Sequence, residues 1–173
     1  MIMFRKKIII PLIIVFAMIS QNSCKVSYSF TGASIPPEAK TYSVQLFQNL
    51  ASIVNPTLAN YITEELKNRF LTQTRLTPVP DFGDFAFSGQ IVTYDVSPTA
   101  IQGDEIAAQN RLTIAVKVKF VNAIDPKQSF DKTFSQYAVF SSNQNFSQVE
   151  QALVQEIVEK LIDDIFNAAA SNW

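Results

Sequence analysis

The stretch at residues 111–121 (RLTIAVKVKFV) alternates regularly in side-chain type, and this alternation constrains the fold more strongly than any other feature of the chain. Successive side chains of a β-strand point to opposite faces, so the stretch predicts a strand with two unlike faces. One face would carry Leu112, Ile114, Val116, Val118 and Phe120. The other face would carry Arg111, Thr113, Ala115, Lys117 and Lys119. Such a strand needs a sheet whose apolar face is covered and whose polar face meets water.

Two segments have the period of an amphipathic helix and would supply that cover. The first begins at Asn55 and Pro56, because Asn can accept hydrogen bonds from free N–H groups and Pro loses nothing at the first helical position. Its apolar residues recur at i, i+4 spacing, at Leu58, Ile62, Leu66 and Phe70. The second begins at residues 147–150 (SQVE), which have the pattern of a capping box, and it continues with one wide apolar stripe.

Three further segments are predicted as strands, at residues 40–47, 84–96 and 128–140. In the middle one the apolar residues change faces at Gly89, which predicts a β-bulge or a sharp bend at that residue. Residues 97–109 would form a loop around Gly103. The element order β, α, β, β, β, α predicts an α+β fold in which two helices pack on one face of a roughly four-stranded, mixed or antiparallel sheet.

The first 24 residues have the composition of an export signal. Arg5, Lys6 and Lys7 precede an uncharged apolar run at residues 8–19, which is too short to cross a bilayer as a helix. Cys24 follows this run and is the only cysteine in the chain. Its position resembles that of the cysteine in a bacterial lipoprotein signal, which becomes the lipid-bearing first residue of the mature protein.

We therefore predict a lipoprotein signal peptide at residues 1–23 and a lipid anchor on Cys24. Gln21 and Ser23 depart from the usual residues before such a cysteine, so an ordinary signal peptide cleaved elsewhere stays open as the alternative. Residues 24–38 are polar and end close to two prolines, which is typical of a tether. Residues 39–173 would then form a single α+β domain.

Composition excludes several classes of function. The chain has no histidine and one cysteine, so zinc-type sites and histidine-based general-base catalysis are excluded. Without the signal peptide the net charge is about −4, which gives the domain no bulk electrostatic reason to bind nucleic acid. Asp104 and Glu105 remain as catalytic candidates, but acidic residues beside Gly103 are ordinary in a turn. We predict no catalytic residues, no metal and no cofactor.

Four stretches of the chain resemble a known family: YSFTGASIPPEAKTYSVQLFQN, NPTLANYITEELKNRFLTQTRL, AIQGDEIAAQNRLTIAVKVKF and TFSQYAVF. They are similar to the lipopolysaccharide-assembly lipoproteins of the LptE family as these occur in Bacteroidetes. The likeness extends from Tyr28 to Trp173 and rests on length and order, because none of these stretches is a catalytic signature.

The resemblance implies a non-enzymatic, outer-membrane lipoprotein of Gram-negative bacteria. Its partner would be a large LptD-type β-barrel, in which it acts as plug and scaffold while lipopolysaccharide is inserted into the outer leaflet. The absence of an acidic cluster after Cys24 favours the periplasmic side of that membrane. Two other classes stay open: an auxiliary periplasmic lipoprotein of an ABC-type export system, and, far behind it, a carboxylate enzyme.

Lipopolysaccharide carries phosphates, and cations would bind them. The polar face of residues 111–121 offers Arg111, Lys117 and Lys119 as candidate lipopolysaccharide-phosphate contacts. Arg111 and Lys119 would lie roughly 26 Å apart along the strand, whereas Lys117 and Lys119 would lie about 7 Å apart and could share one headgroup. A solvated strand face without a ligand is the alternative interpretation.

Overall fold

The computed structural model describes residues 35–99 and 108–170, which belong to one compact unit. The elements in chain order are β1 (Thr41–Val44), β2 (Gln48–Asn49), α2 (Leu58–Gln73), β3 (Thr77–Pro78), β4 (Phe85–Thr99), β5 (Gln109–Asn122), the 3-10 helix η1 (Pro126–Gln128), β6 (Phe130–Ser141) and α3 (Phe146–Ala170). The predictions for the signal peptide, for Cys24, for most of the tether and for Asp104 and Glu105 lie outside the described residues.

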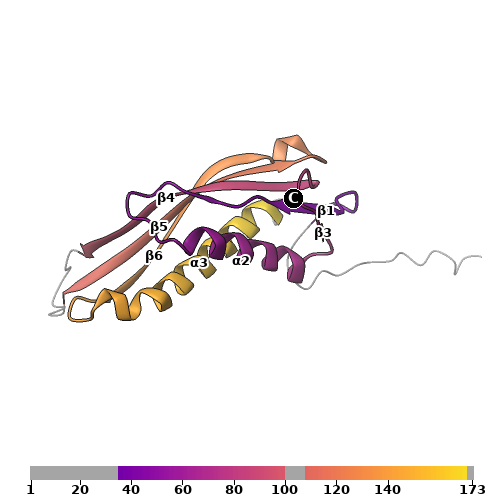
Figure 1. Cartoon of the computed structure of the whole chain (residues 1–173). Helices are drawn as coiled ribbons and strands as arrows, with labels where there is room; N and C mark the ends of the chain where they lie inside the picture. The colour runs from indigo at the N-terminus through magenta and orange to yellow at the C-terminus, as the bar shows by residue number, and fades with distance from the viewer. Residues whose placement is uncertain (1–34, 100–107, 171–173) are drawn as a thin grey trace, which may run out of the picture. The chain divides into compact units, whose positions relative to one another are not determined.

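The strands form one mixed sheet in the order β3-β1-β4-β5-β6, with β2 also paired to β4 (Figure 1). The pairs β1–β3, β1–β4 and β2–β4 are parallel, whereas β4–β5 and β5–β6 are antiparallel. The predicted α+β class is confirmed, but the sheet has six strands rather than about four. The two additional strands, β2 and β3, have two residues each, which is too short to produce a periodic pattern in the sequence.

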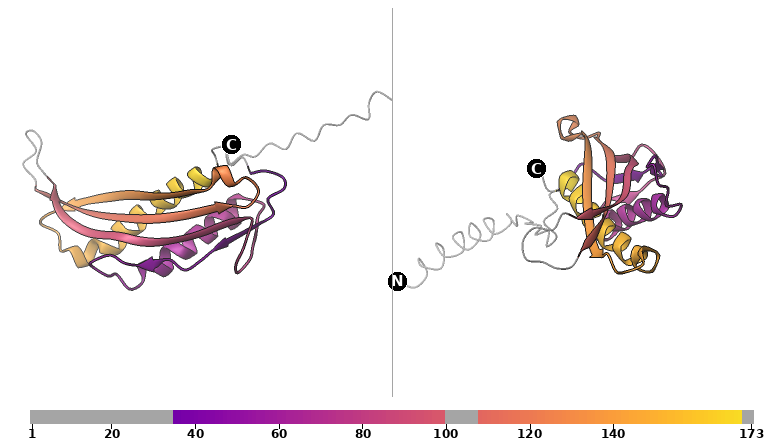
Figure 2. Two further views of the ribbon diagram at one scale, coloured as in Figure 1. Left: turned by 90° about the horizontal axis from the view of Figure 1, so that it is seen from above. Right: turned by 90° about the vertical axis from the view of Figure 1, so that its left-hand side faces the viewer.

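Both helices cover the same face of the sheet, as predicted (Figure 2). We call this the inner face and the opposite one the outer face. The apolar residues predicted for α2 are all buried. So is most of the stripe predicted for α3: Leu153, Val154, Ile157, Val158, Leu161, Ile162, Ile165, Phe166 and Ala169. Within the described residues, no helix is long and apolar enough to cross a membrane.

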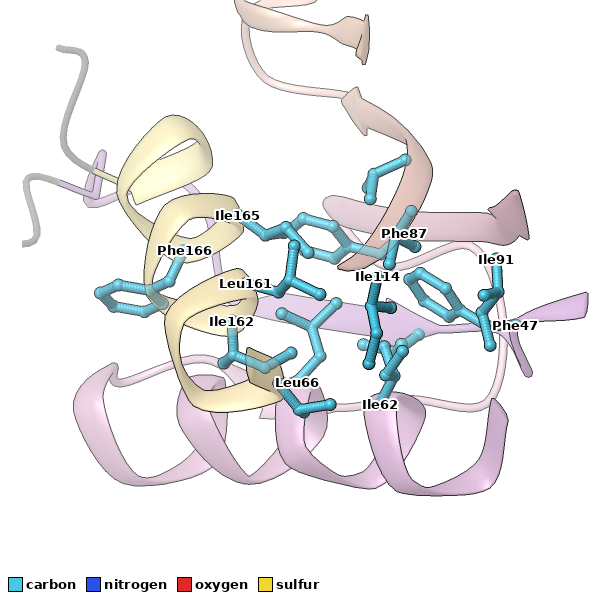
Figure 3. Packing of buried hydrophobic residues seen from close by; sticks show 14 of the residues in the cluster. Phe47, Ile62, Leu66, Phe87, Ile91, Ile114, Leu161, Ile162, Ile165 and Phe166 are labelled. Carbon is cyan, nitrogen blue, oxygen red and sulfur yellow. The ribbon is translucent and has the colours of Figure 1, made fainter. Parts of the chain in front are cut away.

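Apolar side chains of the sheet and of both helices meet in the core (Figure 3), and aromatic rings join the two layers there. The ring of Phe70 on α2 lies with its centroid 4.9 Å from that of Phe87 on β4 and 5.0 Å from that of Phe166 on α3. Phe87 in turn stacks on Phe120 of β5 at 4.8 Å. Such pairs contribute about 0.5–1.5 kcal/mol each beyond their burial, so this chain of rings fixes both helices against the middle strands.

The irregularity in β4 lies beyond the position predicted from the sequence. Pairing with β5 continues without a break through Gly89, and the register shifts between Ile91 and Thr93. Ile91 is buried, and the shift returns Tyr94 to the same inner face, whereas Val92 at the bulge is exposed. The prediction of a bulge or bend at Gly89 was therefore wrong, because the face change depends on the extra residue at Val92.

Gly89 has a different role, because its lack of a side chain leaves room for the ring of Phe47. A Cβ atom on Gly89 would lie 2.4 Å from Cε1 of Phe47, a side chain that is only 1% exposed. Phe47 lies between β1 and β2, and its N–H donates a 3.1 Å hydrogen bond to Oγ1 of Thr63 on α2. Gly89 therefore permits the close approach that attaches the β1–β2 segment to both β4 and α2.

The predicted start of α2 was also displaced. The helix begins at Leu58, two residues after Pro56, with Thr57 at the N-cap and no side-chain cap hydrogen bond from Thr57. Asn55 still accepts hydrogen bonds through Oδ1, from the N–H of Thr57 at 3.1 Å and from its hydroxyl at 2.9 Å. Asn55 therefore closes a turn before the helix instead of capping its first turn.

Candidate functional site

The outer face of the sheet carries the side chains that the helices leave uncovered. The register places Lys117 of β5 opposite Gln90 of β4 and Thr133 of β6. Lys119 lies opposite Ser88 and Asp131 in the same way. Both lysines are exposed, as the predicted alternation requires, whereas Ala115 on the same face is buried.

Lys117 and Lys119 line a hollow of about 290 Å³, which we call the lysine hollow. The other lining residues are Gln45, Leu46, Gln48, Ser88, Gly89, Gln90 and Asp131. Two of these residues, Gln45 and Leu46, belong to the segment between β1 and β2. Ammonium, amide and hydroxyl groups therefore surround one small concave surface, which is the arrangement that hydrogen-bonds to phosphate oxygens.

The lysine hollow also contains an acidic residue, Asp131, which lowers its net positive charge. Nζ of Lys117 lies 3.4 Å from Oδ2 of Asp131, and both side chains are about half exposed (50% and 52%). An ion pair as exposed as this one contributes little to stability, so an anionic ligand can replace it at small cost. The two lysines and Asp131 together leave one net positive charge. Asp131 was missed at the sequence level, because its position depends on the register between β5 and β6.

Arg111 does not reach the lysine hollow. Its register partners are Ser97 and Val139, and the guanidinium carbon lies 4.2 Å from the ring centroid of Tyr137. Nε of Arg111 is buried without a hydrogen-bond partner. The structure thus brings two of the three predicted cations together. The third, Arg111, lies further along the strand and makes a cation–π contact with Tyr137. The strand spacing had already predicted this separation.

A second hollow, of about 420 Å³, lies between the starts of α2 and α3, and we call it the helix-start hollow. It is lined by Asn55, Thr57, Leu58, Tyr61, Ser147, Glu150, Gln151, Val154 and Gln155. Glu150 is the only charged residue among them, so the hollow has the wrong charge for a phosphate. Its polar groups serve a structural network that sequence reasoning did not find.

Glu150 is the centre of that network. Its Oε1 accepts a 2.5 Å hydrogen bond from the hydroxyl of Tyr94 and a 3.0 Å bond from Nδ2 of Asn55. Burial and the adjacent Glu150 carboxylate raise the pKa of Tyr94 well above its ordinary value. The predicted capping box was wrong, because Asn145 accepts the hydrogen bond from the N–H of Ser147 at 3.1 Å. Glu150 is thereby free to connect α3 to β4 and to the segment before α2.

Within residues 35–99 and 108–170, no three side chains of His, Cys, Asp or Glu gather to hold a metal ion. The lysine hollow, by contrast, contains two of the three cations that the sequence analysis named as candidate phosphate contacts.

Comparison with known proteins supplies a family. The model of the LptE family, described as lipopolysaccharide-assembly, matches residues 39–169. Similar solved structures include a minor lipoprotein from Acinetobacter baumannii, with 15% identity over 76% of this chain and 94% of that chain and a TM-score of 0.49. A hypothetical protein from Chlamydia trachomatis has 9% identity, coverages of 78% and 99%, and a TM-score of 0.50. Comparison with curated proteins gives no match.

A protein from Xanthomonas campestris aligns with 10% identity over 79% of this chain and 88% of that chain, at a TM-score of 0.51. At such low identity, the Chlamydia and Xanthomonas structures show a likeness of fold alone. The family match is more informative, because residues 39–169 contain all the described strands and helices except the last residue of α3. The chain therefore belongs to the LptE lipopolysaccharide-assembly family and has a role in lipopolysaccharide assembly.

Proposed function

We propose that this protein is the lipoprotein subunit of an outer-membrane lipopolysaccharide translocon. It acts as plug and scaffold for an LptD-type β-barrel and assists the insertion of lipopolysaccharide into the outer leaflet. The observation that carries the proposal is the family match, which spans residues 39–169 and so includes almost the whole described domain. The protein is not an enzyme in this proposal, in agreement with a chain that lacks histidine.

The architecture suits a scaffold with one ligand-facing side. The inner face is closed by α2 and α3, and its aromatic rings make a rigid core. Neither helix covers the outer face, which holds Lys117 and Lys119 in the lysine hollow. We assign the phosphates of lipopolysaccharide to these two lysines, because ammonium groups bind phosphate oxygens by charge-assisted hydrogen bonds. Arg111 is not included, because its guanidinium stacks on Tyr137.

The anchor completes the proposal. A lipid on Cys24 would hold the domain at the periplasmic side of the outer membrane through the tether at residues 24–38. Each buried methylene of an acyl chain contributes about 0.8 kcal/mol, and stable attachment requires more than one chain. Mass spectrometry of the mature N-terminus tests this directly, since an unmodified Cys24 thiol would contradict it.

Co-purification from outer membranes tests the translocon itself. The full chain with a C-terminal tag would be extracted in mild detergent, and its stoichiometric partners would be identified by mass spectrometry. We expect one large outer-membrane β-barrel protein. Recovery of an inner-membrane ATPase complex in its place would contradict the proposal and favour an auxiliary subunit of an ABC-type exporter. A Cys24→Ala variant provides the control, because it should be lost from the membrane fraction.

A further inference from the structure

The loop between β3 and β4 presents an aromatic side chain in an unusual way. Phe82 is 100% exposed, and its backbone has a φ of 54°. This left-handed conformation is ordinary for Gly and tolerated by Asn, but it is an outlier for a bulky residue. Phe82 therefore carries backbone strain while its ring has no packing inside the described domain to offset that strain.

Hydrogen bonds and close packing against β1 fix the residues that follow Phe82. Oδ2 of Asp84 accepts hydrogen bonds from the backbone N–H groups of Lys40 and Thr41, at 2.8 and 2.9 Å, and from the Thr41 hydroxyl at 2.9 Å. These hydrogen bonds hold the pKa of Asp84 below its ordinary value. On the other side, a Cβ atom on Gly83 would lie 2.6 Å from the backbone of Tyr42. The residues that follow Phe82 are thus fixed against β1, and the ring projects from a rigid base.

The backbone strain at Phe82 is not offset by any packing of its ring within the described domain. Such strain is found where a residue serves a function, so we look for a partner outside the domain that contacts the ring. A protein partner would need a contiguous patch, because stable interfaces bury about 800 Å² on each side. The neighbours of Phe82 in the chain are Asp81 and Gly83, and neither of them extends an apolar surface from the ring. A bilayer interface makes no such demand, since a single apolar side chain such as Phe can be buried at the boundary between headgroups and acyl chains.

The position of the loop in the chain favours a bilayer further. The first described residue, Ile35, is held at this part of the domain by a 2.8 Å hydrogen bond from Arg75 to its carbonyl oxygen. Tyr42 pairs with Phe85 at the start of β4, so the chain enters the sheet beside the loop. The eleven Cα-to-Cα steps from Cys24 to Ile35 reach at most about 40 Å. A lipid on Cys24 would therefore keep Ile35 within about 40 Å of the membrane.

We propose that Phe82 inserts into the interface of the bilayer to which the chain is anchored, and so orients the domain with the start of β4 toward the lipid. This inference rests on the lipid anchor of the proposed function. It goes beyond that function by giving the domain a second, non-covalent membrane contact, which aims the lysine hollow in a defined direction. One ring contributes too little to anchor a protein by itself, so its effect is on orientation.

The test places a fluorescent reporter at the loop tip. Trp173 is the only tryptophan, so a Trp173→Phe background leaves Phe82→Trp as the sole emitter. The chain from Cys24 would be produced with a free thiol and coupled to a maleimide lipid in phosphatidylethanolamine–phosphatidylglycerol vesicles. Asn143→Trp in the same background is the matched control, because Asn143 is exposed and follows β6 at the opposite end of the sheet.

We expect the Phe82→Trp emission to shift to the blue on coupling and to be quenched by brominated lipids, while the Asn143→Trp emission stays that of a water-exposed indole. Equal, water-like spectra for both variants would overturn the proposal. A second variant, Phe82→Asn, should raise the Tm of the uncoupled domain, because Asn tolerates the left-handed conformation. A lowered Tm would mean that the ring supports the fold, which would also overturn it.

The chemical coupling keeps this test independent of the proposed function. Failure of acylation at Cys24 in cells would contradict the natural anchor without changing the vesicle result. Failure of Phe82→Trp to insert would leave co-purification of the barrel unaffected.

Discussion

The two faces of the sheet differ in how much of their side-chain surface the rest of the protein covers. On the inner face, Phe87 and Ile114 are buried, and so is Leu161 of α3, which covers that face. On the outer face, Lys117 and Lys119 line the lysine hollow, and the exposed ion pair between Lys117 and Asp131 contributes little to stability. The inner face therefore determines whether the chain folds, and the outer face is available for a ligand. Substitutions on the two faces should have separable effects.

The largest effect is expected at the centre of the inner face. Ile157→Ala or Leu161→Ala should lower the free energy of unfolding by roughly 2–5 kcal/mol, because each leaves a cavity between α3 and the sheet. Urea denaturation of the mature domain measures this. Lys160→Ala on the exposed side of the same helix is the matched control, with a change of about 0.5 kcal/mol or less. Losses as small as the control's at both core positions would mean that the stripe is not core.

A smaller effect is expected where the inner face meets the β1–β2 segment. Gly89→Ala should lower the free energy of unfolding by about 1–3 kcal/mol, because its Cβ would collide with the ring of Phe47. In a Phe47→Leu background the same change should cost less, since the collision with the ring is relieved and only the close contact with the Lys117 backbone oxygen, at 2.9 Å, is left. The double-mutant cycle is read from urea midpoints, and additive effects would show that Gly89 does not make room for the ring of Phe47.

The network at the helix starts should contribute less again. Tyr94→Phe removes the hydrogen bond to Glu150 and should cost about 1–2 kcal/mol. Because the folded-state pKa of Tyr94 is raised above its ordinary value of 10.0, its contribution is fully present below pH 10 and is lost as the pH rises further. The wild-type domain should therefore lose more stability than Tyr94→Phe between pH 9 and 11. Identical pH profiles would contradict the assignment.

The two faces also differ in how far the sequence predicts them. The spacing of apolar residues alone identified the buried stripes of both helices and the inner face of β5, because this spacing can be read within a single segment. The bulge at Val92 and the partner of Glu150 depend on which residues lie opposite, so local patterns gave Gly89 and a capping box instead. On the outer face the sequence identified Lys117 and Lys119 but not Asp131, which only the pairing with β6 brings beside them.

The central claim is that the lysine hollow binds lipopolysaccharide phosphate, and the double variant Lys117→Glu with Lys119→Glu tests it most directly. This change should alter the free energy of unfolding by about 1 kcal/mol or less, because both lysines are exposed. Lys67→Glu with Lys160→Glu makes the same change of net charge on the exposed sides of the helices and serves as the control. Circular dichroism of both double variants confirms that the fold is retained.

The measurement is the affinity of each purified double variant for lipopolysaccharide. The two lysines would each form charge-assisted hydrogen bonds to phosphate, so their reversal should weaken binding at least about tenfold, whereas the helix control should bind like the wild type. Equal affinities for the two double variants would contradict the account and remove the lysine hollow from lipopolysaccharide recognition.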